Sequence, residues 1–169
     1  SHSCLKFHYK KLDRCAGSPP RIRTLRYGQS VPLITVVTAA KNAASFLAST
    51  ITSIQDQTLG DYAHVIVDDG STDTTADIVE AAAARDPRIQ LVRLDESIGP
   101  YAAANSVMLN ASTPYLARID ADDIAPPRRL EIQVAALAAD PGRVASTGAW
   151  QIMRNDVLGP TPRQVPSDS

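Results

Sequence analysis

The sequence predicts an α/β fold, a mostly parallel sheet with helices on both faces. Short β-branched runs alternate with segments of helical period over residues 31–153, as expected when crossover helices return the chain to one sheet. Two of these runs end in clusters of aspartate, and the carboxyl ends of strands form the ligand-binding edge of open α/β sheets. A chain of 169 residues is long enough for one domain with a buried core.

The elements of the first half follow from apolar runs and the breakers between them. Residues 33–37 form the first predicted strand, and residues 38–42 form a loop of small side chains. The helix after this loop carries apolar residues at roughly helical spacing: Phe46, Leu47, Ile51 and Ile54. The second strand spans 63–67, and a turn of Gly, Ser, Thr and Asp then leads into a helix over 74–84.

The second half continues the alternation. A third strand covers 89–94, and the helix over 100–110 begins with proline, which a first helical turn tolerates. The fourth strand, 115–119, ends in acidic residues. A helix over 127–140 opens on a proline and ends before another, and residues 144–153 form one more predicted strand.

Charge is distributed unevenly along the chain. Residues 1–30 hold seven Lys or Arg and one acid, a net charge of +6, whereas residues 31–169 hold ten basic and seventeen acidic residues, a net charge of -7. We expect residues 1–30 to be a basic extension or linker and residues 31–169 to be the domain. The acidic domain argues against nucleic acid as a partner, while the basic extension suits peripheral attraction to an anionic membrane surface.

The sequence carries no sign of export or membrane insertion. No apolar run approaches the roughly 20 residues that span a bilayer, and no signal-peptide pattern opens the chain. The two cysteines, Cys4 and Cys15, precede the domain, so nothing indicates a disulfide-stabilised secreted fold. We therefore expect a cytoplasmic protein, with the inner face of the cell membrane as the surface that the basic extension would contact.

The residues after the fourth strand carry the clearest chemical signal. Asp120, Asp122 and Asp123 lie within four positions, and close carboxylates repel one another unless a cation lies among them. The second strand delivers Asp68 and Asp69 to the same edge of the sheet. Such oxygen ligands favour Mg²⁺ or Mn²⁺, which complete their coordination with water and phosphate oxygens. The alternative for the Asp-x-Asp segment alone is a solvated acidic turn before the next helix.

Several other catalytic motifs are missing from the sequence. It has no Gly-x-x-x-x-Gly-Lys-Ser/Thr loop, no Gly-x-Gly-x-x-Gly and no serine nucleophile elbow. A magnesium-dependent phosphoryl-transfer or receiver-type domain would also gather carboxylates at strand ends. It would want a lysine or threonine nearby, and the lack of any lysine after residue 41 argues against it.

Four motifs, taken together over residues 33–150, resemble glycosyltransferase family 2. They are Val36-Val37-Thr38 with Asn42, Val67-Asp68-Asp69-Gly70-Ser71-Thr72-Asp73, Gly99-Pro100 with Asn105, and Asp120-Ala121-Asp122-Asp123. The last motif, with Arg118 before it and Gly148-Ala149-Trp150 beyond, is most similar to bacterial enzymes of exopolysaccharide and capsule assembly.

The resemblance implies a GT-A fold and inverting transfer of a sugar from a nucleoside diphosphate donor, often UDP-linked. The acceptor would be a glycan or a lipid-linked glycan in polysaccharide synthesis, and the cofactor Mn²⁺ or Mg²⁺. The implied donor-binding residues are Thr38 and Ala39 in the base pocket, Asp68 and Asp69 at base and ribose, Asp120 at ribose or sugar hydroxyls, Asp122 at the metal and diphosphate, and Arg118. The implied metal ligands are Asp122, as the main one, with Asp120 and Asp123.

The sequence departs from the family pattern at three positions. Ala39 stands where the family often has proline, Lys41 where it has an aromatic residue, and Ala104 where it has a basic one. The last departure leaves the diphosphate short of a cation. Arg118 either supplies that charge or braces the loop after the fourth strand, and the sequence leaves both open. We interpret three further residues as capping or packing residues: Ser45, Tyr101 and Trp150.

The acceptor side of the family pattern is the part we do not find. In this family a downstream carboxylate acts as the base that deprotonates the acceptor hydroxyl. Here 46 residues follow Asp123, and the acids after Asp140 are Asp156 and Asp168. We therefore expect a donor-binding half that lacks the acceptor-side C-terminal part, with the base unassigned and Asp156 as a candidate. A non-catalytic nucleotide-sugar-binding module is the alternative function.

Overall fold

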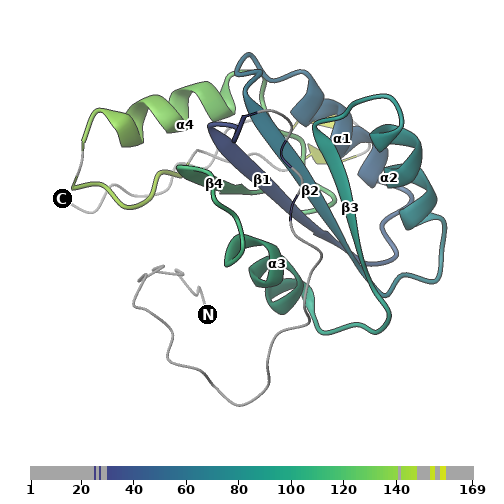
Figure 1. The fold of residues 1–169 in the computed structure, drawn as a ribbon. Helices are drawn as coiled ribbons and strands as arrows, with labels where there is room; N and C mark the ends of the chain where they lie inside the picture. The colour runs from purple at the N-terminus through teal and green to yellow at the C-terminus, as the bar shows by residue number, and fades with distance from the viewer. Residues whose placement is uncertain are drawn as a thin grey trace, which may run out of the picture.

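Four parallel strands form the central sheet of the molecule (Figure 1). The computed structural model describes Leu25, Tyr27, residues 30–140 and 142–147, and two short strands beyond them. The sheet has the order β3-β2-β1-β4 and consists of β1 (Ile34–Ala40), β2 (Tyr62–Asp69), β3 (Ile89–Leu94) and β4 (Tyr115–Arg118). The predicted parallel sheet is confirmed, with β1 placed between the two strands that lead to acidic residues.

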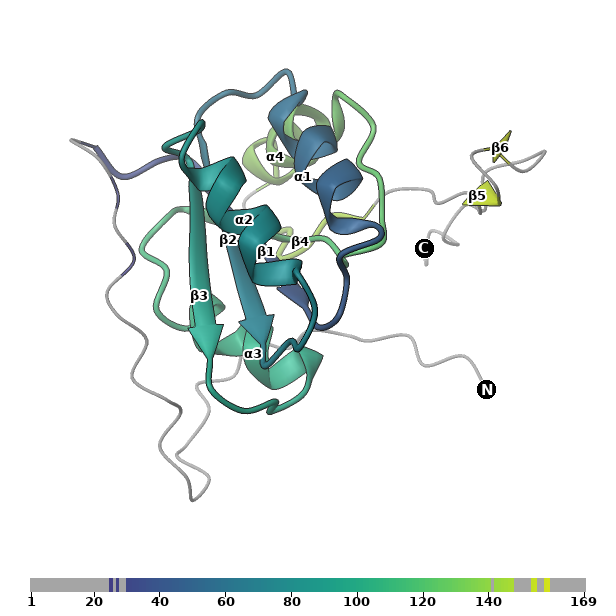
Figure 2. The same ribbon diagram turned by 90° about the vertical axis from the view of Figure 1, so that its right-hand side faces the viewer.

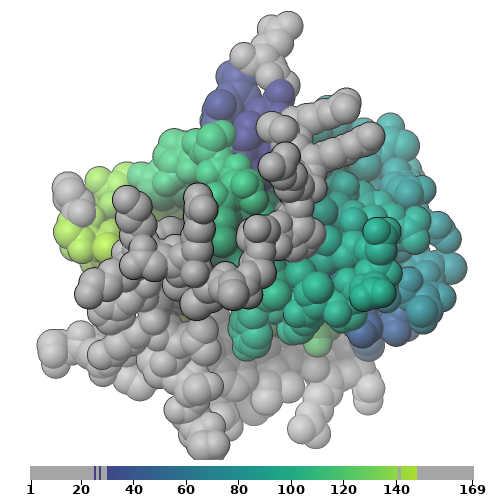
Figure 3. All heavy atoms as spheres, turned by 60° about the horizontal axis from the view of Figure 1, so that its bottom comes forward, coloured from purple at the N-terminus to yellow at the C-terminus, as the bar shows by residue number. Residues whose placement is uncertain are grey.

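Helices cover both faces of the sheet, as predicted (Figure 2). They are α1 (Leu47–Gln55), α2 (Thr75–Ala83), α3 (Pro100–Met108) and α4 (Arg129–Ala138). On one face, which Figure 3 brings forward, Val107 of α3 packs in a core cluster with Val37 of β1. On the other face, Leu47 of α1 shares a cluster with Ile66 of β2, and Leu130 of α4 joins the neighbouring cluster.

The two central strands are buried along nearly their whole length. All eight residues of β2 and six of the seven residues of β1 are buried. Their side chains alternate between the α3 face and the α1–α2 face, so both faces of each strand are covered. A parallel sheet covered on both sides reads in sequence as continuous apolar runs, which explains why the sequence predicted the presence of both strands, although not their full lengths.

The predicted loop over 38–42 is wrong at its start. β1 continues to Ala40, because Thr38, Ala39 and Ala40 pair with Ile66, Val67 and Asp68 of the longer strand β2. β2 likewise continues through Asp69, so its two aspartates lie inside the strand instead of in the following loop. The small side chains of residues 38–40 indicated a loop, but these residues form a strand because they pair with the longer strand β2.

The C-terminal strand prediction is wrong over residues 144–147. Those residues form no strand, and Val144 is 87% exposed. Residues 148–152 lie outside the part of the chain that the structure describes. Beyond them, β5 (Met153–Arg154) pairs antiparallel with β6 (Val157–Leu158).

The end of the basic extension contacts the domain. Leu25 is 7% exposed and belongs to the α3-side core cluster, and the hydroxyl of Tyr27 is 3.2 Å from the hydroxyl of Thr35. A boundary at residue 30 therefore separates these two residues from the core in which they take part. Residues 1–24 lie outside the part of the chain that the structure describes. Within the described part, no helix has the length and apolar character needed to cross a membrane.

Candidate functional site

A cleft of about 640 Å³ opens at the carboxyl edge of the sheet. It lies where β1, β2 and β4 end side by side, which is the edge at which open α/β sheets bind ligands. Its lining comes from four segments, namely residues 39–43 with Phe46, Asp69, Ser97 with Pro100 and Tyr101, and Arg118 with residues 120–122. The structure thus brings together Ala39, Asp69, Arg118, Asp120 and Asp122 of the predicted site.

One wall of the cleft is the loop between β1 and α1. Hydrogen bonds of Asn42 with Ser71 and Thr72, called the Asn42 latch below, fix this loop. Asn42 adopts a left-handed backbone conformation with φ of 50°, which asparagine tolerates better than most residues. Its backbone N–H donates to Ser71 Oγ at 2.9 Å, and its side-chain oxygen accepts the N–H of Thr72 at 2.9 Å. The Ser-Thr pair after β2 therefore holds the β1–α1 loop in place.

The same two loops are also joined just before the start of α1. The N–H of Ala43 donates to Thr75 Oγ1 at 2.8 Å, and the N–H of Ala44 donates to Asp73 Oδ2 at 3.2 Å. These N–H groups precede the helix and would otherwise lack acceptors. The hydroxyl of Thr75 donates to Asp73 and holds the pKa of that carboxyl below its usual range. Asp73 thus supports the loop without lining the cleft.

Asp69 anchors a second wall of the cleft, the loop between β3 and α3. Its carboxylate is buried and accepts three hydrogen bonds, from Ser97 Oγ at 2.8 Å and from the N–H groups of Ile98 and Gly99 at 2.7 and 3.0 Å. Because Gly99 precedes the first turn of α3, the anion also lies at the positive end of that helix. Asp69 borders the cleft, but its main contacts are with the protein.

Asp68 lies behind the cleft. Its side chain is 1% exposed, its Oδ1 accepts the N–H of Ser71 at 3.0 Å, and its Oδ2 is 3.6 Å from Arg93 Nε. A direct contact with base or ribose is therefore not available to this carboxylate in the observed arrangement. Asp68 instead supports the loop that holds Asn42.

Thr38 is also buried beneath the cleft. Its hydroxyl is 3.0 Å from Nε2 of His64, and neither side chain is exposed. Burial lowers the pKa of His64 to about 3, so the imidazole is neutral at physiological pH. The neighbouring Ala39 lines the cleft, because successive strand residues face opposite sides. Of the pair predicted for the base pocket, the structure exposes Ala39 alone.

Arg118 joins two walls of the cleft. Its Nη2 donates to Asp120 Oδ1 at 2.7 Å, and its guanidinium carbon lies 4.8 Å from the ring centre of Tyr101 on α3. Its Nε is buried and has no hydrogen-bond partner within the described part of the chain. Of the two roles left open by the sequence, the bracing role is visible, and the side chain also reaches the cleft.

The acidic segment after β4 presents two carboxylates to the cleft, those of Asp120 and Asp122. Asp123 lies outside the lining, and burial together with the charges of Asp120 and Asp122 raises its pKa. Two exposed carboxylates are a donor set that fits a hard divalent cation, which takes its remaining ligands from water and a phosphorylated ligand. Among the residues described, no three acidic, histidine or cysteine side chains converge as a complete protein-only metal site.

Sequence reasoning missed two aromatic residues of the cleft. Phe46 was assigned to the apolar side of α1, but it precedes the helix and is 59% exposed. Tyr101 was interpreted as a packing residue, but it is 58% exposed. The proline that opens α3 is the signal that places Tyr101 in the first turn, near the cleft. Ser45 makes no capping bond to α1, and Trp150 and Asp156 lie outside the described residues.

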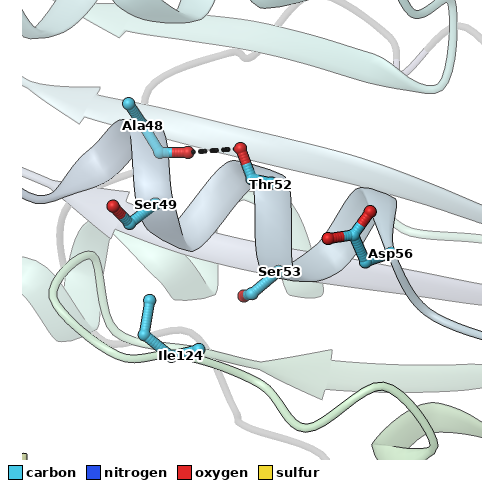
Figure 4. A pocket seen from close by; sticks show the side chains of 6 residues that line it. All are labelled: Ala48, Ser49, Thr52, Ser53, Asp56 and Ile124. Carbon is cyan, nitrogen blue, oxygen red and sulfur yellow. Dashed lines mark hydrogen bonds between the residues drawn. The ribbon is translucent and has the colours of Figure 1, made fainter. Parts of the chain in front are cut away.

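A second, shallower hollow of about 360 Å³ lies along α1 (Figure 4). Its lining consists of Ala48, Ser49, Thr52, Ser53 and Asp56 of α1 and its end, together with Ile124. Its one ionisable side chain is acidic and no basic residue lines it. The hollow therefore has no group that would attract an anionic ligand, which leaves the larger cleft as the candidate site.

Comparison with known proteins agrees with this geometry. The model of the family described as Glycosyl transferase family 2 matches residues 35–164. The chain is 34% identical over 125 residues to TuaG of Bacillus subtilis (strain 168), a glycosyltransferase provisionally assigned to teichuronic acid biosynthesis, covering 74% of this chain and 49% of TuaG. It is 30% identical over 124 residues to the succinoglycan biosynthesis protein ExoU of Rhizobium meliloti (strain 1021), covering 73% and 33%.

Solved structures share the fold. The mannosyltransferase PcManGT from Pyrobaculum calidifontis, in complex with GDP-Man and Mn²⁺, has a TM-score of 0.59 and 27% identity, over 75% of this chain and 37% of that one. S. aureus TarS 1-349 in complex with UDP has a TM-score of 0.59 at 19% identity, over 71% and 41%. These likenesses confirm the expected GT-A architecture.

The chain spans about a third to a half of the length of the first curated relatives that it matches. Over that shared length the match includes the strands, the loops and the acidic segment that build the cleft. The sequence motifs, the parallel sheet with its cleft and the family model all agree, and the chain belongs to glycosyl transferase family 2.

Proposed function

We propose that this chain binds the donor in a metal-dependent, inverting glycosyltransferase. The donor is a nucleoside diphosphate sugar, UDP-linked by the family resemblance, and the acceptor is a glycan or lipid-linked glycan in polysaccharide synthesis. The cleft that Asp120 and Asp122 share with Arg118 is the observation that carries the proposal. Binding of GDP-Man and Mn²⁺ by the similar PcManGT supports the ligand class, and the bacterial relatives named for teichuronic acid and succinoglycan biosynthesis support the role in polysaccharide synthesis.

The cleft divides the donor between two sides. Ala39 and Asp69 border the side next to β1 and β2, where the base and ribose are placed, while Thr38 and Asp68 support that side from behind. Asp120, Asp122 and Arg118 border the side next to β4, where the diphosphate and sugar are placed. Asp122 is the principal metal ligand of this proposal, because it is exposed and no hydrogen bond or ion pair of a described residue occupies its carboxylate.

The chemistry required of these residues is modest. In an inverting transfer the acceptor hydroxyl attacks the anomeric carbon from the side opposite the diphosphate, which leaves with the bonding electron pair. A divalent cation bound at Asp122 would neutralise the charge that develops on that leaving group. Arg118 contributes a further positive charge at the same side, and its contacts with Asp120 and Tyr101 hold the guanidinium in one orientation.

A non-catalytic nucleotide-sugar-binding module is the second candidate, and one observation favours it. The carboxylates that line the cleft are Asp69, Asp120 and Asp122, and each has a role in the fold or the donor site. The lining of the cleft, as far as the structure describes it, therefore offers no further carboxylate for the base. Such a base contributes roughly 10²- to 10⁴-fold to a rate, so this candidate predicts donor binding without acceptor-dependent release of UDP.

Calorimetric titration with UDP in Mn²⁺ and in EDTA tests the proposal. We expect tighter binding with Mn²⁺, and we expect Asp122→Ala to remove that difference. Asp77→Ala, which removes an exposed carboxylate from the first turn of α2, is the matched control and should bind like the parent. Equal affinity in Mn²⁺ and EDTA would refute metal dependence. Measurement of UDP released from UDP-sugars with a panel of glycan acceptors separates transfer from binding alone.

A further inference from the structure

The charged side chains that line the cleft leave one cation unused. Two cations, Lys41 and Arg118, and three carboxylates line it. Asp69 is occupied by its three internal donors, and Arg118 is paired with Asp120. In the part of the chain described by the structure, Lys41 and Asp122 have neither a hydrogen bond nor an ion pair. The cleft therefore keeps one positive and one negative group available for a ligand.

The backbone on both sides of Lys41 is fixed. The preceding residue, Ala40, ends β1, is 2% exposed and pairs with Asp68. The following residue, Asn42, is latched to Ser71 and Thr72. An exposed side chain between two fixed neighbours cannot be withdrawn by a loop movement without breaking the β1–β2 pairing or the latch. The position of the Lys41 ammonium is thus limited to the reach of its own flexible stem.

Lys41 follows β1, which lies between β2 and β4, so it lines the cleft between the base side and the diphosphate side. We propose that Lys41 binds the phosphate groups of the nucleotide ligand and supplies the second positive charge of the cleft. This inference rests on the proposed donor site. An ammonium is a compact cation with three donors that suits phosphate oxygens. α3 contains no Lys or Arg that could compete for this task, and Ala104, at the position where the family often has a basic residue, is 2% exposed in the core. A metal–diphosphate ligand needs both unpaired groups, an anion for its cation and a cation for its phosphates.

The test compares ligands that share a base and differ in phosphate. Uridine, UMP and UDP are titrated into the full chain and into Lys41→Met, which keeps the length of the stem and removes the charge. We expect Lys41→Met to weaken UDP binding about tenfold, in keeping with one charge-assisted hydrogen bond at an exposed site. Uridine binding should change less than about twofold, and Lys41→Arg should keep UDP affinity within about threefold.

A control and a salt series distinguish local contact from general charge. Arg85→Met removes a positive charge from the end of α2, where Arg85 bonds its own helix, and should leave UDP affinity unchanged. Between low and high salt, the parent should lose more UDP affinity than Lys41→Met. Salt screens the attraction between Lys41 and the phosphates, and the variant lacks this attraction from the start. If Lys41→Met weakens uridine and UDP binding equally, or leaves UDP binding unchanged, the proposed role of Lys41 is overturned while the donor site stands. A parent chain that binds no UDP would overturn the donor site and this inference together.

Discussion

Replacement of Asp69 by alanine tests whether the main role of this carboxylate is to stabilise the fold. The substitution leaves the N–H groups of Ile98 and Gly99 and the hydroxyl of Ser97 without their acceptor. The Ser97 hydroxyl can turn to solvent, so its loss costs little. The two N–H groups are fixed by the backbone and cannot turn away.

The structure sets the size of the effect. A buried N–H without an acceptor costs about 1–3 kcal/mol, and the lower end applies because Ile98 and Gly99 are only partly covered. Loss of an anion at the start of α3 adds about 0.5 kcal/mol. We therefore expect Asp69→Ala to lower the free energy of unfolding by about 2–3 kcal/mol. Asp95→Ala, an exposed acid nearby in the same loop, should stay within about 0.5 kcal/mol of the parent.

Urea denaturation followed by circular dichroism measures both variants, and a constant m-value shows that the same unfolding is compared. If Asp69→Ala is no less stable than Asp95→Ala, the three hydrogen bonds do not anchor the loop and this reasoning fails. The measured stability of Asp69→Ala also sets the conditions under which its ligand binding can be measured. A loss of UDP affinity in Asp69→Ala that spares inorganic pyrophosphate would support a base contact, provided that both titrations are made where the variant is folded.

The remaining predictions concern the metal, pH and the N-terminal segment. Asp122→Ala should abolish the difference in UDP affinity between Mn²⁺ and EDTA, as measured by calorimetry. Burial lowers the pKa of His64 to about 3, whereas the unfolded chain titrates near 6.5; protons therefore favour the unfolded state between these values. The free energy of unfolding should fall by about 2 kcal/mol from pH 7.5 to pH 5, and His64→Asn should flatten this pH profile in urea titrations. Deletion of residues 1–24 should change stability by less than about 1 kcal/mol, whereas deletion of residues 1–28 should cost about 2–3 kcal/mol in thermal or urea unfolding, because it removes the buried Leu25.

Local pattern was enough for most of the fold. Residues 89–94 were predicted as a strand and form β3 with those bounds, because β-branched and apolar residues between clear breakers leave little choice. The same reasoning failed at Thr38, whose small neighbours indicated a loop. The extent of a strand depends on the length of its partner, and this pairing is not encoded in local spacing.

The sequence predicted which acidic residues lie near the site, but not which of them are buried and which are exposed in the cleft. Asp122 and Asp120 line the cleft as expected, since acids that follow a parallel strand meet at one edge. Asp68 was indistinguishable in sequence from Asp69, yet the strand turns them to opposite faces and Asp68 lies behind the cleft. The exposure of Tyr101 depends on the position of α3 relative to β4, which is a tertiary property.

The latch at Asn42 has a consequence for the thermodynamics of binding. Five hydrogen bonds join the loop before α1 to the loop before α2 and the first residue of α2, so the two loops are ordered when the chain folds. A ligand that binds against the β1–α1 loop contacts a segment that is already ordered in the free protein. Affinity there does not have to offset the ordering of a mobile segment, which commonly costs a binding site several kcal/mol. Amide hydrogens of residues 42–44 should accordingly exchange slowly with solvent even in the absence of nucleotide, although they belong to a surface loop.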